Sequence, residues 1–298
     1  MTMSDEALAL DRAIPDIDWR VFPPGTERDR ISAPSGELAR VRLGDPAAPR
    51  IVLVPGVAGS KEDFVRLFPL LAEAGFRVES YDIAGHYESA QAGPANLDPP
   101  RERYDFPLFV DDLIAVLEDG DGPAHVLGYS FAGLVVELAL VQRPELFRSI
   151  TLMSAPPAVG QVFRGVKHIG PISDMPPRRA AGLILWGIRY NLNRTPPRRI
   201  AFVRERMAIT ERASIDDIVG LMMTMPDIVD RVAATDVPKL IAVGERDLWP
   251  EEQHRSFARR IGARVAVYPT GHAPCETAPH QLTRDLLRLY DEAGSADI

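Results

Sequence analysis

Apolar residues along the chain follow two patterns, short unbroken runs and longer runs with helical spacing. The unbroken runs predict buried strands, and the clearest of them cover 51–54, 124–129, 149–154, 239–243 and 263–267. Helical spacing predicts helices over 60–74, 106–117, 180–190, 200–209 and 279–292, and edge strands are expected at 18–22 and 37–43. This map places the chemistry-bearing motifs described next in loops that follow strands.

The strongest chemical signal is the motif Gly-Tyr-Ser-Phe-Ala-Gly at 128–133, between an apolar strand and a helical pattern. A serine on a sharp strand-to-helix turn has strained backbone angles and tolerates only small neighbours two positions away. Ala132 stands where the pattern G-x-S-x-G has its second glycine, and alanine keeps the required small size. The motif predicts a nucleophile elbow with Ser130 at its tip, and a glycine-rich turn of any doubly wound protein is the alternative.

A serine hydroxyl is a weak nucleophile, so this interpretation requires a histidine and an acid elsewhere in the chain. His272 lies in the loop after the strand 263–267, and Asp247 ends Gly-Glu-Arg-Asp after the strand 239–243. The chain order is therefore Ser130, Asp247, His272, which is the order of α/β-hydrolases. Each partner is expected at the carboxyl end of a parallel strand, where open α/β sheets form their sites.

Five separated segments together resemble the α/β-hydrolase fold superfamily of the serine hydrolase type, which includes esterases and lipases. Besides the three segments above, Pro-Gly-Val-Ala-Gly at 55–59 resembles the oxyanion-hole loop of that family. The stretch Asp-Ile-Ala-Gly-His-Tyr-Glu-Ser at 82–89 resembles the family's strand-end loop Asp-x-x-Gly-His-Gly-x-Ser. Two positions depart from the family pattern: Pro55 replaces a histidine and Tyr87 replaces a glycine. The resemblance implies a mostly parallel eight-stranded α/β-hydrolase sheet flanked by helices, with an inserted helical cap.

The resemblance also implies a role for each site residue. Ser130 would be the nucleophile, His272 its base and Asp247 the acid that orients the histidine. The backbone N–H groups of Val57 and Phe131 would form the oxyanion hole. In the strand-end loop, the family pattern makes His86 a residue that pins the loop.

The segment 157–236 differs from the rest of the chain, and we expect it to be a helical cap that acts as a mobile lid. The core domain would then comprise 1–156 and 237–298. The segment holds 12 Lys and Arg and 8 Asp and Glu, a net charge of +4, which leaves −12 for the remainder. Arg178 and Arg198 each begin an arginine pair that could attract an anionic substrate group, or could simply belong to a solvated helix face.

The cap also contains five of the eight methionines. Flexible thioether side chains suit an acyl pocket under a lid and equally suit the cap's own core. We therefore expect one or more of Met222, Met223 and Met225 to contact substrate, together with Tyr129 beside the serine.

Composition limits the remaining possibilities. The 298 residues are 46% hydrophobic and carry a net charge of −8, which argues against nucleic acid as a partner. The single cysteine, Cys275, excludes an internal disulfide and is expected to pack beneath the histidine loop. No histidine pair or cysteine cluster has metal-ligand spacing, so neither a metal nor another cofactor is implied. No apolar run approaches the roughly 18 residues of a membrane span, and a cytoplasmic location is expected. The oligomeric state is left open.

The predicted function is a serine hydrolase that cleaves a carboxylic ester of a small, moderately apolar substrate through an acyl-enzyme. A thioesterase, an amidase, a C–C bond hydrolase and an acyltransferase are alternatives on the same fold. Epoxide hydrolases and haloalkane dehalogenases of this fold use aspartate at the nucleophile position, so Ser130 argues against both. A small-molecule receptor or a pseudoenzyme is the non-enzymatic alternative.

Overall fold

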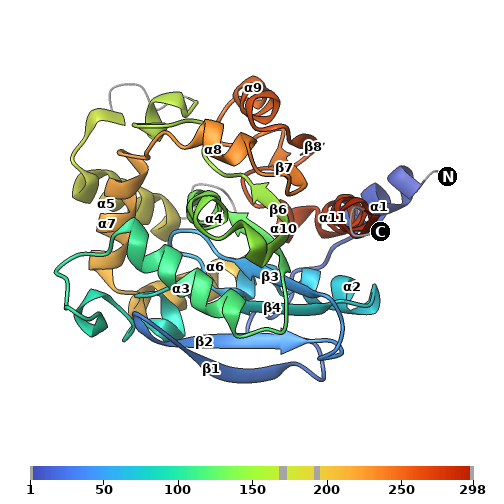
Figure 1. The fold of residues 1–298 in the computed structure, drawn as a ribbon, viewed down its shortest axis with the longest axis horizontal. Helices are drawn as coiled ribbons and strands as arrows, with labels where there is room; N and C mark the ends of the chain where they lie inside the picture. Colours follow the sequence, from blue (N-terminus) through green and yellow to red (C-terminus); the bar gives the residue numbers. More distant parts are fainter. Residues whose placement is uncertain (1–2, 168–172, 191–194, 296–298) are drawn as a thin grey trace.

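A computed structural model describes residues 3–167, 173–190 and 195–295, and its centre is one eight-stranded sheet (Figure 1). The strands are Glu27–Ala33 (β1), Gly36–Leu43 (β2), Arg50–Val54 (β3), Arg77–Tyr81 (β4), Ala124–Tyr129 (β5), Phe147–Met153 (β6), Lys239–Gly244 (β7) and Arg264–Tyr268 (β8). Their order across the sheet is β1-β2-β4-β3-β5-β6-β7-β8. Only β2 runs antiparallel to its neighbours β1 and β4, and all other neighbouring strands are parallel. The predicted mostly parallel α/β-hydrolase sheet is confirmed.

Helices cover both faces of this sheet (Figure 1). Outside the segment 157–236 they are Met3–Arg12 (α1), Leu67–Glu73 (α2), Phe106–Glu118 (α3), Phe131–Gln142 (α4), Glu251–Ile261 (α9), Pro274–Thr277 (α10) and Pro279–Ser295 (α11). Single 3₁₀ turns occur at Lys61–Phe64 (η1), Tyr87–Ser89 (η2), Pro94–Asn96 (η3) and Pro144–Leu146 (η4). The first helix packs against the last, so both ends of the described chain lie on one side of the molecule (Figure 1).

The hydrophobic core is divided in two by the sheet, and alternate residues of one strand enter different halves. In β3, Val52 and Val54 join the half that contains α3 and α4, whereas Ile51 and Leu53 join the half that contains α2 and α11. This period of two follows from the pleat of a strand. Because both faces are covered, the central strands are continuous apolar runs, which is why their positions could be predicted.

The segment 157–236 lies between β6 and β7 and is called the helical insertion below. Its elements are Val162–Gly165 (η5), Pro177–Arg189 (α5), Pro197–Ile209 (α6), Arg212–Met222 (α7) and Val229–Ala233 (α8). The predicted helices at 180–190 and 200–209 correspond to α5 and α6. In Figure 1, α5 and α7 lie together at the side of the molecule away from the chain ends.

Two local predictions were wrong. Residues 18–22 do not form a strand, because the Asp18 carboxylate accepts a hydrogen bond from the Arg20 amide and closes a turn. The region 60–74 is not one helix but η1 followed by α2. Pro69 has no N–H to bond the carbonyl of Val65, so an unbroken helical ladder cannot run through this region.

Candidate active site

Ser130 occupies the sharp turn between β5 and α4. Its backbone angles are φ 53° and ψ −118°, a strained conformation for a residue with a side chain. A Cβ atom at Gly128 would lie 2.6 Å from the Ala132 carbonyl oxygen, and one at Gly133 would lie 2.3 Å from the Cβ of Ala155. The glycines are therefore required by close packing around the serine, as the motif predicted.

The structure brings Ser130, His272 and Asp247 together. The Nε2 of His272 lies 3.2 Å from the Ser130 Oγ, and its Nδ1 lies 2.6 Å from Oδ1 of Asp247. The three residues follow the carboxyl ends of β5, β8 and β7, at one edge of the sheet. The Asp247 carboxylate can only accept, so the network assigns the proton on Nδ1 and leaves Nε2 free to accept from the serine hydroxyl.

Asp247 is almost completely buried, with 1% of its side chain exposed. Burial raises the pKa of this carboxyl, but the hydrogen bond and charge of His272 outweigh burial, so the pKa lies below its ordinary value. The Leu248 amide also donates to Oδ1 at 2.5 Å. The aspartate is therefore ionised at neutral pH and holds the imidazole through one oxygen.

The loop 55–59 approaches the serine closely. A Cβ atom at Gly56 would lie 3.0 Å from the Cβ of Ser130, so only glycine allows this approach. Within the part of the chain that the structure describes, the amides of Val57 and Phe131 donate to no protein acceptor. Both amides remain available to an oxygen bound next to Ser130.

The His86 side chain holds the loop 55–59 in place through a hydrogen bond to its backbone. Its ring is fully buried, its Nε2 accepts from the Ala58 amide at 3.1 Å, and its Nδ1 donates to the Ala84 carbonyl at 3.1 Å. Ala58 has a positive φ of 58°, which is unfavourable for alanine and needs such support. Burial lowers the pKa of His86 to about 4, so the ring is neutral and its acceptor nitrogen is available at pH 7. These contacts agree with the loop-pinning role that the family pattern gives to His86.

A buried ion network beside this loop was not predicted from the sequence. Arg199 and Arg206 of α6 both bind Asp63 of η1, and Arg199 also binds Glu276 of α10. The Arg206 guanidinium further donates to the Ser60 hydroxyl at 3.2 Å. The helical insertion is thus joined by ion pairs to η1 and α10, the elements that follow the loops carrying Val57 and His272.

The arginines and methionines of the insertion for which a substrate contact was predicted are not part of this ion network. Arg178 faces solvent with 87% of its side chain exposed, and Arg198 is also exposed. Met222 and Met225 lie in the hydrophobic core, and Met223 packs at its margin. The exposed arginines therefore form a solvated face, and the position of the methionines is that of core residues. A substrate contact by the methionines stays a prediction.

Three further residues flank the site. The Tyr129 ring lies 5.4 Å from the His272 ring, between centroids. Tyr87 keeps a positive φ of 42°, as the glycine that it replaces would, and its ring packs against Lys61 and Phe202. Cys275 is buried below the histidine loop, and burial raises the pKa of its thiol, which fits the packing role expected from the sequence.

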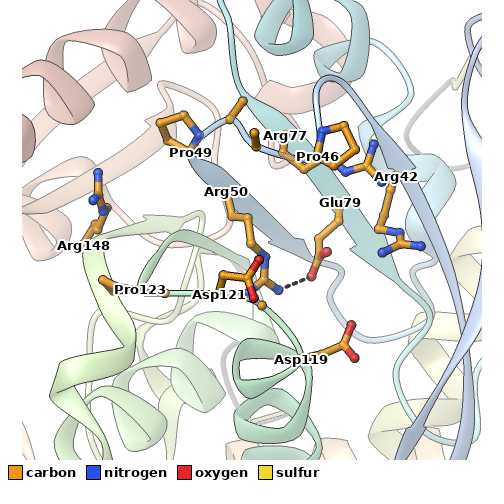
Figure 2. Close-up of a pocket in the computed structure, with 14 residues that line it drawn as sticks. Arg42, Pro46, Pro49, Arg50, Arg77, Glu79, Asp119, Asp121, Pro123 and Arg148 are labelled. Carbon is orange, nitrogen blue, oxygen red and sulfur yellow. Dashed lines mark hydrogen bonds and ion pairs between the residues drawn. The ribbon is translucent and has the colours of Figure 1, made fainter.

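Two surface cavities lie away from the triad. One, of about 400 Å³, lies at the amino-terminal edge of the sheet, where Arg50 begins β3 and Pro123 precedes β5 (Figure 2). Figure 2 shows Arg50 bound to Glu79 in this cavity, at 2.9 Å. The other, of about 510 Å³, lies between the segment 17–23 and α2. Neither cavity is lined by Ser130, Asp247 or His272.

The described ranges 3–167, 173–190 and 195–295 contain no group of three or more His, Cys, Asp or Glu side chains that could hold a metal ion. None of their helices is long and apolar enough to cross a membrane.

The fold and this edge of the sheet define an α/β-hydrolase. The family model described as "Alpha/beta hydrolase family" matches residues 51–285, and the chain belongs to that family.

Individual relatives are distant. The chain is 24% identical over 287 residues to the polyketide synthase ThaQ of Burkholderia thailandensis, a match that covers 90% of this chain but only 13% of ThaQ. Among solved structures, a carboxylesterase of the thaumarchaeon Nitrososphaera gargenis is similar with a TM-score of 0.72 and 19% identity, over 91% of this chain and all of that one. A thioesterase domain from the curacin biosynthetic pathway is similar with a TM-score of 0.67 and 15% identity, over 88% of this chain and 99% of that one. At these identities the structural similarities show the fold alone.

Proposed function

We propose that this α/β-hydrolase is a serine hydrolase that cleaves a carboxylic ester, or a related acyl bond, of a small and moderately apolar substrate. The observation that carries the proposal is the hydrogen-bonded chain from Ser130 through His272 to Asp247, with the serine on a strained strand-to-helix turn. A serine with a base in reach, and a base oriented by a third group, is the arrangement that nucleophilic catalysis requires. In this proposal, 1–156 and 237–298 form the catalytic core and the helical insertion forms its cap.

The proposed reaction has two halves. In the first, His272 takes the proton of the Ser130 hydroxyl while Oγ attacks the acyl carbonyl carbon. The amides of Val57 and Phe131 would stabilise the oxyanion, and Asp247 would stabilise the imidazolium. The intermediate collapses to an acyl-enzyme as the leaving group departs with the proton from His272. In the second half, His272 deprotonates a water that attacks the acyl carbon, and the carboxylic acid leaves as Ser130 regains its proton.

A thioesterase is the second candidate. The similarities to the polyketide synthase ThaQ and to the thioesterase domain of the curacin pathway favour it. The same residues would act, with a thiol as the leaving group in place of an alcohol. Matched substrates separate the two functions: a butyryl thioester of N-acetylcysteamine and the corresponding ethyl ester differ only in the leaving group. The larger kcat/KM identifies the preferred bond.

The helical insertion would cover the site as a cap, but one of its helices is anchored. Separating α6 from the core would expose or unpair the charges of Arg199, Arg206 and Asp63, which is costly for buried ions. This argues against a lid that moves as one unit.

The decisive experiment compares wild type with Ser130→Ala. The wild type should hydrolyse a short p-nitrophenyl ester and should be labelled at Ser130 by a fluorophosphonate probe. Ser130→Ala should lose both properties with an unchanged circular dichroism spectrum. Ser149→Ala is the matched control, because the hydroxyl of this buried serine is hydrogen-bonded to His125 near the start of β5, and its loss should leave both properties unchanged. Full activity in Ser130→Ala would overturn the proposal, and a wild type with neither turnover nor labelling would favour a receptor or pseudoenzyme.

A further inference from the structure

Three buried polar groups without hydrogen bonds gather around Asp247. The Oδ2 of Asp247, the Nε2 of His254 and the Oγ of Ser154 all lie out of contact with solvent and have no partner within hydrogen-bonding geometry. Nε2 of His254 faces Oδ2 of Asp247 at 3.8 Å. The Ser154 hydroxyl is near enough to this carboxylate to contribute to the lowering of the Asp247 pKa, although no hydrogen bond of normal geometry joins the two groups. Buried polar atoms are nearly always paired, so such a cluster beside one carboxylate calls for an explanation.

The two carboxylate oxygens of Asp247 differ in the number of hydrogen bonds that they accept. Oδ1 accepts from both His272 and the Leu248 amide, whereas Oδ2 accepts no hydrogen bond of normal geometry. A carboxylate held through one oxygen can still rotate about its Cβ–Cγ bond, and rotation would carry Oδ1 away from His272. A donor on Oδ2 would prevent that rotation.

His254 can supply this donor. It lies in α9, and 1% of its side chain is exposed. Burial lowers the pKa of His254 to about 4, so the ring is neutral and carries one N–H. The charged and titratable groups around it are Asp247, His272, Lys167 and Glu251. Of the two neutral tautomers, only the one with hydrogen on Nε2 avoids placing a nitrogen lone pair against the carboxylate. A contraction of about 0.8 Å would bring the two atoms to normal hydrogen-bonding distance.

The buried indole of Trp249 lies beside both histidines. Its ring lies perpendicular to that of His254 at 6.5 Å and 6.1 Å from that of His272, between centroids, and its Nε1 donates to the Val162 carbonyl at 2.9 Å. Hydrogen bonds to a charged group in such a water-poor environment are stronger than those at the surface.

We infer that His254 is a positioning residue: it donates its Nε2–H to Oδ2 of Asp247 and holds the carboxylate so that Oδ1 faces His272. Ser154, which directly follows β6, acts on the same carboxylate. This role rests on the proposed function, because it matters only if His272 acts as the base for Ser130. It explains why a histidine that the sequence places within an amphipathic helix lies in the core beside the aspartate.

The test compares three substitutions at one position. His254→Leu and His254→Asn remove a donor that can reach Oδ2, and each should lower kcat roughly 5- to 30-fold with little change in KM, as expected for one lost hydrogen bond to a charged group. His254→Gln offers an amide N–H at nearly the position of Nε2 and should restore kcat to within about threefold of wild type. The rate of fluorophosphonate labelling of Ser130 should be lower in His254→Leu and His254→Asn and should return toward the wild-type rate in His254→Gln.

His125→Gln is the matched control, because His125 is another buried histidine, paired with Ser149 far from the triad. It should change the melting temperature without changing kcat. The inference is overturned if folded His254→Leu or His254→Asn keeps the wild-type kcat, or if His254→Gln loses as much activity as they do. Failure of the proposed function itself looks different: the wild type would then show neither turnover nor labelling.

Discussion

Arg206 of α6 and Asp63 of η1 form an ion pair that is buried between the helical insertion and the loop beside Ser130. Arg199 binds the same carboxylate from about two turns earlier in α6. Burial raises the pKa of Asp63, but the two guanidinium groups outweigh burial and hold the pKa below its ordinary value. The pair fixes α6 to the candidate oxyanion loop, so it couples the stability of the insertion to the geometry of the site.

Asp63→Asn should destabilise the protein strongly. It leaves two buried guanidinium groups with only Glu276 as a counter-charge, and breaking a buried pair in this way typically costs about 3–5 kcal/mol. Urea denaturation at pH 7 measures the free energy of unfolding. Arg20→Gln is the matched control, because Arg20 also joins α6 to the rest of the chain, through Glu205, but in a pair with 49% of each side chain exposed. It should change stability little, since solvent screens such pairs.

The pH dependence of the stability of Asp63→Asn tests whether the Asp63 charge is the cause of the loss. Because the pKa of Asp63 is lowered in the folded state, its stabilising effect is present above its unfolded pKa of about 3.9 and is lost as the pH falls through the folded pKa. The difference in unfolding free energy between wild type and Asp63→Asn should therefore shrink below pH 4. A difference that stays constant down to pH 3 would show that charge is not its cause.

His86→Leu should impair catalysis without removing any group of the triad. The substitution leaves the Ala58 amide without its acceptor and releases the loop that carries Val57. Loss of one oxyanion donor typically lowers kcat about 10²- to 10³-fold, and a displaced donor should lower it roughly 10- to 100-fold. His86→Gln keeps an acceptor in the same region and should lose less. Kinetics on a p-nitrophenyl ester measures both variants, and a wild-type kcat in His86→Leu would contradict the pinning role.

His86 should also contribute to acid instability. Its pKa is about 4 in the folded protein and about 6.5 in an unfolded chain, so the unfolded state binds more protons between these values. The contribution of His86 to the free energy of unfolding is fully present above about pH 6.5 and declines as the pH falls toward 4. His86→Gln should remove this part of the pH dependence, which thermal melts between pH 4 and 7 can measure.

The three residues that form the hydrogen-bonded chain, Ser130, His272 and Asp247, share one property: each is marked by its own local motif. The small residues around Ser130, the Gly-Glu-Arg-Asp segment and the Gly-His loop are all local requirements of turns at strand ends. The central strands were predictable for a similar reason, because burial on both faces produces unbroken apolar runs. The wrong strand at 18–22 shows the limit of this reasoning, since one hydrogen bond that the Asp18 carboxylate accepts from the Arg20 amide closes a turn where the pattern predicts a strand.

The groups that support the site could not be predicted, because tertiary packing alone pairs them. Asp63 lies 136 residues from Arg199 and 143 from Arg206, and in the sequence all three are typical of a solvated helix face. His254 is similar: its position in an amphipathic helix indicates the buried face of α9 but not which side chain it meets. Of the arginine pair 198–199, only the second member turns inward, and helical phase decides this only once the packing of α6 is known.

Gly128→Ala should disrupt the turn at Ser130. The added methyl group would lie 2.6 Å from the Ala132 carbonyl oxygen, and backbone atoms must move to relieve this clash. Overpacking of this kind typically costs about 1–3 kcal/mol, and a shifted elbow would separate the Ser130 Oγ from His272. We expect a lower melting temperature together with at least a tenfold loss of kcat. Gly122→Ala is the control, since nothing lies within 4 Å of its added methyl group, and wild-type kcat in both variants would show that the turn tolerates the extra carbon.

Glu137→Gln should stabilise the protein increasingly as the pH rises. Glu137 is buried in α4, its Oε1 has no hydrogen bond, and burial raises its pKa to about 8. The unfolded chain releases this proton near pH 4.3, so the folded state, which retains it, loses about 1.4 kcal/mol of stability per pH unit between roughly 4.3 and 8. Glutamine cannot ionise and removes this slope, whatever constant cost its amide adds. Urea denaturation between pH 5 and 8 measures the slope, and Glu73→Gln, at an exposed position in α2, is the control that should leave it unchanged. If Glu137→Gln and wild type keep a constant difference in stability over this range, Glu137 is not the buried acid that limits stability at neutral pH.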